Sequence, residues 1–167
     1  LVLDRAIAGD EAAFAEIVAM HHADLRRVAY VVCADREMAD DAAQQAWQIA
    51  WRRISSVRDA AALRSWLVAI AANEARKLAS RGRRRVVLEG RVRDVSRETD
   101  PAARLDSLDL VRALSRLSPD DRALLAMRYL AGLDSSEIAR ARGRSASGIR
   151  GRLARLLTSL REELEHG

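Results

Sequence analysis

Residues 135–155 carry the side chains best suited to bind a nucleic acid. Two short segments with apolar anchors flank Gly143, and this spacing is typical of a helix-turn-helix. The second segment presents hydroxyl and guanidinium groups near its start: Ser145, Ser147, Arg150, Arg152 and Arg155. A helix N-terminus can hold phosphate, and arginine can donate two hydrogen bonds to guanine. The pattern predicts contacts with duplex DNA, and a helical hairpin with a solvated basic face is the alternative.

A second basic group lies within residues 73–85. Its members share one face of an expected helix, opposite an apolar core: Asn73, Arg76, Lys77, Arg81, Arg83, Arg84 and Arg85. Amide, lysine and arginine groups on one exposed face suit contacts with phosphates and with single-stranded or groove DNA. For this segment alone, a merely solvated face stays open as the alternative interpretation.

An acidic and amide-rich stretch offers the opposite chemistry at residues 40–45, with Asp40, Asp41, Gln44 and Gln45. Charge also alternates along the chain, whose net charge is +5. Residues 58–97 carry 11 basic and 4 acidic side chains, and residues 138–167 carry 7 and 3. Residues 1–57 and 98–137 are each net −3. Two basic blocks between acidic ones predict two contacts with a polyanion and two surfaces for another partner.

The residues that catalysis would need are missing from the pattern. With three histidines and one cysteine, we can assemble no Ser/His/Asp set, metal cluster or Gly-rich phosphate loop. The sequence therefore predicts no enzyme, no cofactor and no metal. The lone Cys33 predicts a buried free thiol in a reducing compartment. No apolar run approaches the roughly 20 residues of a membrane span, and no export signal opens the chain, so we expect a cytoplasmic protein without membrane insertion.

Helices must position all of these groups. The 167 residues include only 2 prolines and 8 glycines, and aromatic residues make up 4%, which favours an all-α fold over a sandwich or barrel. Apolar residues recur every three or four positions after Asp10, Asp35 and Asp59, each a plausible N-cap. We expect the third of these helices to end at Gly82.

The pattern predicts two small helical domains. Residues 1–85 form a three-helix bundle, and residues 102–167 hold the helix-turn-helix. Between them, residues 86–101 alternate in charge without an apolar period, which predicts a flexible linker. Cap residues mark the expected helix starts after the linker: Asp100, Ser118, Asp134 and Ser145.

Several short segments match a known family when they are taken together. They are DDAAQQAW at 40–47, LRSWL at 63–67, IAAN at 70–73, MRYLAGL at 127–133, SEIA at 136–139 and IRGRL at 149–153. This joint pattern spans nearly the whole chain and resembles the bacterial RNA polymerase sigma factors of the extracytoplasmic-function group (ECF, group IV).

The resemblance implies a sigma factor, which binds core RNA polymerase and directs promoter recognition, DNA melting and transcription initiation without catalysis of its own. Domain 1–85 would be sigma domain 2, and domain 102–167 would be sigma domain 4. Asp40, Asp41, Gln44 and Gln45 would face the clamp helices of the β′ subunit, and the second domain would also meet the β flap. Such factors often have an anti-sigma factor, so the resemblance implies that partner as well.

The resemblance also implies two promoter contacts. The loop of Ser56, Val57, Arg58 and Asp59 would hold a base flipped from the −10 element. Further −10 contacts would come from Asn73, Arg76, Lys77, Arg81, Arg83 and Arg84. The helix that carries Ser145, Ser147, Arg150, Arg152 and Arg155 would enter the major groove at the −35 element.

A free-standing helix-turn-helix regulator, which binds duplex DNA without polymerase, is the competing hypothesis. The basic face at residues 73–85 and the acidic stretch at 40–45 disfavour it, because such a regulator needs neither.

Overall fold

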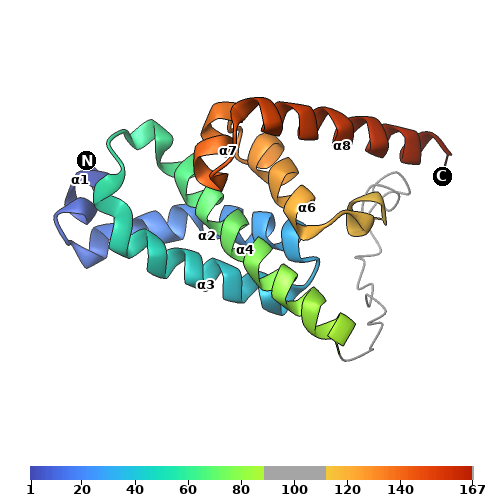
Figure 1. Cartoon of the computed structure of the whole chain (residues 1–167). Coiled ribbons are helices and arrows are strands. Elements are labelled where there is room, and N and C mark those ends of the chain that lie inside the picture. The colour runs from blue at the N-terminus through green and yellow to red at the C-terminus, as the bar shows by residue number, and fades with distance from the viewer. Residues whose placement is uncertain (89–111, 167) are drawn as a thin grey trace.

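The computed structural model describes residues 1–88 and 112–166, and every regular element in these residues is helical, so the all-α prediction is confirmed (Figure 1). The N-terminal half contains α1 (Val2–Ile7), α2 (Glu11–Cys33), α3 (Arg36–Arg53) and α4 (Leu63–Leu88). Two 3₁₀ turns, η1 (Ile54–Ser56) and η2 (Ala60–Ala62), join α3 to α4. The C-terminal half contains α6 (Pro119–Leu125), the π-helical turn η3 (Ala126–Leu130), α7 (Ser135–Arg142) and α8 (Ala146–His166).

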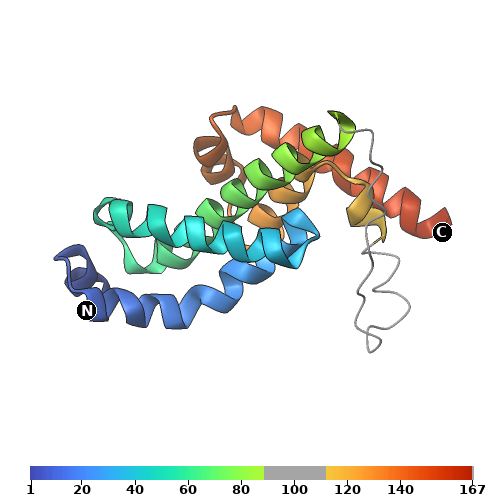
Figure 2. The same cartoon turned by 90° about the horizontal axis from the view of Figure 1, so that it is seen from below.

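The N-terminal half is a bundle of α2, α3 and α4, with α1 packed against α2. In Figure 2, α2 and α3 run side by side and α4 crosses them. Much of the contact surface is alanine: Ala29, Ala43, Ala46, Ala71 and Ala75 are all buried. Small side chains allow the helix backbones to approach closely, so this bundle needs few large residues in its centre.

Three of the predicted N-caps are present in this half. Asp10 accepts a hydrogen bond from the Ala13 amide at 3.1 Å, and Asp35 accepts one from the Met38 amide at 2.9 Å. Asp59 caps the short turn η2, with α4 following directly after it.

The predicted end of the third helix at Gly82 is wrong, because α4 continues to Leu88. A Cβ at position 82 would lie 2.9 Å from Cε of Met38 in α3. The glycine therefore makes room for a neighbouring side chain and does not end the helix. Residues 86–88 of the expected linker are helical, and its residues 89–101 lie outside the described residues. Of the helix expected after Asp100, residues 112–116 are described and helical, and the part before them lies outside.

The caps predicted at Ser118 and Asp134 are also confirmed, whereas Asp100 lies outside the described residues. Ser118 accepts from the Asp121 amide, and Pro119 occupies the first turn of α6. Asp134 and Glu137 form the predicted capping box at the start of α7. Gly143 ends that helix with φ of +61°, a conformation that glycine adopts without strain.

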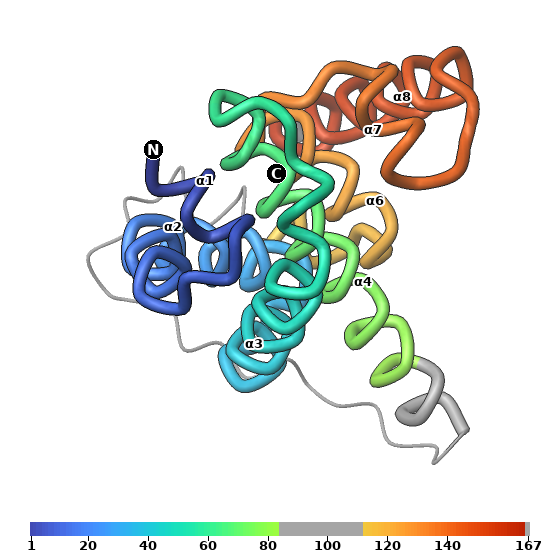
Figure 3. Tube along the Cα trace, turned by 90° about the vertical axis from the view of Figure 1, so that its left-hand side faces the viewer, coloured from blue at the N-terminus to red at the C-terminus, as the bar shows by residue number. Residues whose placement is uncertain are grey.

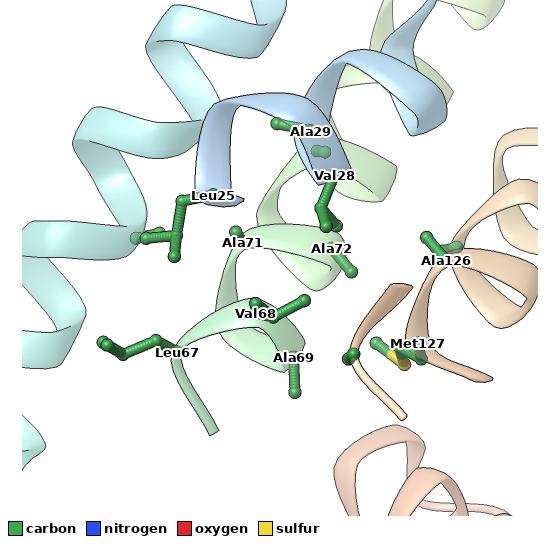
Figure 4. Packing of buried hydrophobic residues seen from close by; sticks show 14 of the residues in the cluster. Leu25, Val28, Ala29, Leu67, Val68, Ala69, Ala71, Ala72, Ala126 and Met127 are labelled. Carbon is green, nitrogen blue, oxygen red and sulfur yellow. The ribbon is translucent and has the colours of Figure 1, made fainter. Parts of the chain in front are cut away.

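The two halves pack directly against each other through apolar side chains. In Figure 3, α4 lies between α3 on one side and α6, α7 and α8 on the other. Met127 of η3 is fully buried and faces Val68, Ala69 and Ala72 of α4 (Figure 4). These residues belong to a single buried cluster that runs through both halves. The described part of the chain therefore has one continuous hydrophobic core that both halves share.

Candidate nucleic-acid interface

The helix-turn-helix places its second helix, α8, with a polar face toward solvent. Ile149 and Leu153 are buried and anchor α8. The side chains of Ser145, Ser147, Arg150 and Arg155 are exposed, as a DNA-reading face requires.

A hydrogen bond at the start of α8 explains one of its glycines. The hydroxyl of Ser145 accepts a hydrogen bond from the Gly148 amide at 3.2 Å. A Cβ at position 148 would lie 2.9 Å from that hydroxyl, so the cap itself favours glycine there.

Arg152, the remaining member of the predicted −35 set, is arranged differently. It is half-buried, and its Nε donates to Asp121 of α6 at 2.6 Å. This hydrogen bond raises the pKa of Arg152. Four of the five predicted residues are thus exposed on the outer face of the helix-turn-helix, whereas the fifth is bound to a carboxylate of α6.

The loop predicted to hold a flipped base is short and well braced. Ser56 donates to the Arg53 carbonyl at 2.7 Å, and Asp59 caps η2. Val57 is buried, so it anchors the loop, while the side chains of Ser56, Arg58 and Asp59 are exposed. The loop therefore offers polar groups on a backbone that is fixed at both ends.

The predicted basic face of α4 is divided by the packing of the two halves. Arg81 and Arg83 are exposed, as is Lys77, whose Nζ lies 2.6 Å from Glu74. Asn73 instead donates to the Ala141 carbonyl of α7 at 3.3 Å, and Arg76 lies 3.5 Å from Asp120 of α6. The side chain of Arg84 is outside the described residues.

Asp120 is the centre of an ion-pair cluster that no sequence pattern predicts. Its carboxylate lies 2.5 Å from Arg142 and 4.0 Å from Arg144, in addition to Arg76. Burial raises the pKa of Asp120, but the three guanidinium groups outweigh it, and the pKa is lowered overall. Within the described residues, Nε of Arg76 and Nη1 of Arg142 are buried without a hydrogen-bond partner. The cluster therefore contains more donors than its carboxylate can satisfy.

Arg122 is a buried structural arginine that the sequence does not reveal. It is 8% exposed and donates to three backbone carbonyls, those of Val32 in α2 and of Ser115 and Leu117 before α6. Burial lowers the pKa of Arg122. It thus joins the end of α2 to the start of α6, and no sequence pattern identifies it because arginine is usually exposed.

The predicted polymerase-facing residues lie on the outer side of α3. Asp40, Asp41 and Gln44 are exposed and Gln45 is half-buried, opposite the buried alanines of the same helix. The Asp40 carboxylate lies 2.5 Å from Arg26 of α2. The structure therefore presents these four side chains together on one acidic and amide-rich surface.

Other classes of site are not found in the part of the chain that the structure describes. Its histidine, cysteine and acidic side chains form no group that could hold a metal ion. No helix there is long and apolar enough to span a membrane. Cys33 is buried with a free thiol, as predicted, and burial raises its pKa to about 12.

Comparison with known families matches both halves of the chain. Residues 17–85 match the family described as Sigma-70 region 2, and residues 107–160 match Sigma-70, region 4.

Named relatives match nearly the whole chain. The ECF RNA polymerase sigma factor SigM of Mycobacterium tuberculosis is 32% identical over 150 residues, which are 89% of this chain and 76% of that protein. The RNA polymerase sigma factor NccH of Alcaligenes xylosoxydans xylosoxydans is 27% identical over 93% of this chain and 89% of that protein. A protein of Xanthomonas campestris pv. campestris, named "Probable RNA polymerase sigma factor RfaY", is 29% identical over 97% of this chain, which spans only 43% of its length.

Two solved structures share the fold. One is the sigma factor RpoE from Bartonella quintana in complex with the anti-sigma factor NepR, with a TM-score of 0.67, 24% identity and coverage of 91% of this chain and 96% of that one. The other is CnrH in complex with the cytosolic domain of CnrY, with a TM-score of 0.68, 24% identity and coverage of 99% and 96%.

Proposed function

The chain belongs to the ECF RNA polymerase sigma factors, and we propose that it binds core RNA polymerase and directs promoter recognition, DNA melting and transcription initiation. It acts as a non-catalytic specificity subunit in the cytoplasm, where the polymerase works. The observation that carries this proposal is the presence of a Sigma-70 region 2 match and a region 4 match in one chain. A free-standing regulator needs only the second.

The polymerase contact in this proposal is the exposed side of α3. Asp40, Asp41, Gln44 and Gln45 share that surface and meet the clamp helices of the β′ subunit, while the C-terminal half meets the β flap. The acidic character of the surface supports a protein partner, because a polyanion such as DNA would be repelled by it.

The promoter contacts in this proposal use the two basic regions. The braced loop at residues 56–59 and the exposed Lys77, Arg81 and Arg83 of α4 engage the −10 element. Exposed hydroxyl and guanidinium groups at the start of α8 read the −35 element in the major groove. Flipping a base costs a few kcal/mol of stacking free energy. Simultaneous binding to polymerase and to both promoter elements offsets that cost.

An anti-sigma factor is the third partner in this proposal. The solved relative RpoE is in complex with the anti-sigma factor NepR, and CnrH is likewise bound to another protein, the cytosolic domain of CnrY.

Run-off transcription with purified core polymerase tests the proposal. We expect initiation that depends on the added chain. Tight, sequence-specific binding of duplex DNA by the chain alone, without initiation in the presence of core polymerase, would instead identify a free-standing regulator.

A matched pair of variants on α8 tests the −35 assignment. Arg150→Ala should weaken use of promoters that depend on the upstream element by about tenfold, corresponding to one base contact, and leave the pull-down of core polymerase unchanged. Arg161→Ala removes an exposed arginine about three turns further along the same helix and should change neither. Equal losses for both variants would count against the assigned role.

A further inference from the structure

Two adjacent acids at the start of α6 hold arginines from the surfaces that would bind DNA. Asp120 lies within 4.0 Å of Arg76, Arg142 and Arg144, and Asp121 accepts a hydrogen bond from Arg152 at 2.6 Å.

These arginines come from both predicted DNA-binding regions. Arg76 belongs to the basic face of α4, and Arg152 belongs to the helix that would enter the major groove. Arg142 is the last residue of α7, and Arg144 lies in the turn that joins α7 to α8. Two neighbouring carboxylates thus engage cationic groups from each of the two promoter contacts at once.

The hydrogen bonds in this cluster are incomplete. Four guanidinium groups meet two carboxylates, which leaves a surplus of positive charge. Nε of Arg76 and Nη1 of Arg142 are buried without a partner within the described residues. A row of DNA phosphates offers further acceptor oxygens beyond those of the two carboxylates, and bidentate contacts between arginine and phosphate are strong. Exchange of these carboxylates for phosphates would therefore satisfy donors that are now unpaired.

We propose that Asp120 and Asp121 form an acidic clasp, an internal substitute for DNA phosphates that occupies these arginines and keeps α6 and α7 over the DNA-binding face of α4. This inference rests on the proposed function for its identification of DNA as the competing polyanion. The hydrogen bond from Asn73 to the Ala141 carbonyl lies in the same contact between the halves. The closed molecule consequently cannot offer Asn73 and Arg76 to DNA until the halves separate.

Binding of DNA by the isolated full-length chain measures the clasp without polymerase. The probe is a fluorescein-labelled duplex of random sequence, followed by fluorescence anisotropy over a range of salt concentrations. We expect Asp120→Asn/Asp121→Asn to raise the affinity about tenfold over the control below. The plot of log affinity against log salt should steepen by about 2, since Arg76 and Arg152, the two released arginines that belong to the predicted promoter contacts, each engage a phosphate that contributes about 0.9.

The matched control is Glu16→Gln/Glu37→Gln, which changes the net charge equally at two exposed positions on α2 and α3. It should show only the small, general gain that follows from removing two negative charges. Equal affinity and equal salt slope for the two double variants would overturn the proposal.

A single variant keeps the test decisive if the double variant does not fold, as judged by circular dichroism. Asp121→Asn releases Arg152 alone, and asparagine keeps an oxygen beside Ser118. The salt slope should then steepen by about 0.9, and an unchanged slope would again overturn the clasp. Run-off transcription by the unmodified chain distinguishes the two proposals. If the unmodified chain supports initiation and the variants show no change in salt slope, only the clasp is refuted. If the variants show a steeper salt slope and the unmodified chain supports no initiation, only the sigma-factor function is refuted.

Discussion

Replacement of Arg122 by methionine should destabilise the protein by about 2 kcal/mol. The guanidinium donates at 2.7 Å to the Val32 carbonyl, and at 3.2 Å and 3.4 Å to the carbonyls of Leu117 and Ser115. A hydrogen bond from a charged donor contributes about 1.5–3 kcal/mol, and the two longer bonds contribute less. Methionine fills similar space and avoids the free-energy cost of burying a charge, which offsets the loss of the two longer bonds. The net loss in stability is therefore close to the contribution of the single short hydrogen bond to Val32.

Urea unfolding, followed by circular dichroism, measures this loss. With a slope of about 2 kcal/mol per molar urea, the midpoint should fall by about 1 M at an unchanged slope. Arg122→Lys keeps the charge but lacks the planar fork that reaches several carbonyls, so it should recover less than half of the loss.

The control for this experiment is Arg161→Met, since Arg161 is exposed on α8. Its midpoint should stay within the error of the unmodified chain. A change below about 0.5 kcal/mol for Arg122→Met, which is the usual range of surface substitutions, would refute the idea that this arginine joins α2 to α6.

Three further predictions concern single positions. Gly82→Ala should stabilise the chain by about 0.5 kcal/mol in urea unfolding, because alanine favours the helix by about 1 kcal/mol and displacing the flexible end of Met38 costs only part of that gain. Gly148→Ala should give no gain in the same measurement, because its Cβ would displace the Ser145 hydroxyl that caps α8. The buried Cys33 thiol, with its pKa raised to about 12 from 9.0, should react with iodoacetamide at neutral pH at least about a thousandfold more slowly in the folded chain than in urea, and equal rates would contradict its burial. The pKa of Asp120 is lowered, so its ion pairs stabilise the folded chain above the ordinary carboxyl pKa, and this stabilisation is lost as the pH falls below about 4. In urea unfolding at a series of acid pH values, the free energy of unfolding of the unmodified chain should therefore fall more steeply than that of Asp120→Asn.

The local signals in the sequence predict the starts of the helices well. Asp10, Asp35 and Ser118 cap helices as expected, because a cap joins a side chain to an amide only three residues away. Gly82 is misjudged for the opposite reason. Its role depends on Met38, which lies on another helix, and sequence distance hides that contact.

The packing of the two halves could not be predicted from the sequence. Periodicity finds one apolar stripe on α4, whereas its small residues, such as Ala69 and Ala72, also pack against η3. The predicted DNA-binding residues belong to basic helix faces that the sequence pattern expects to be exposed. Asn73 and Arg76 satisfy that pattern, yet in the folded chain both contact the other half.

The continuous core through both halves links opening of the molecule to its solubility. Separation of the halves would expose Met127 together with Val68 and Ala72, which are all buried in the closed form. An opened chain would thus carry a fresh apolar patch and would self-associate unless a larger protein covered it. In the unmodified chain, a partner broad enough to shield the parted surfaces would therefore both release the DNA-binding residues and protect the exposed patch from aggregation.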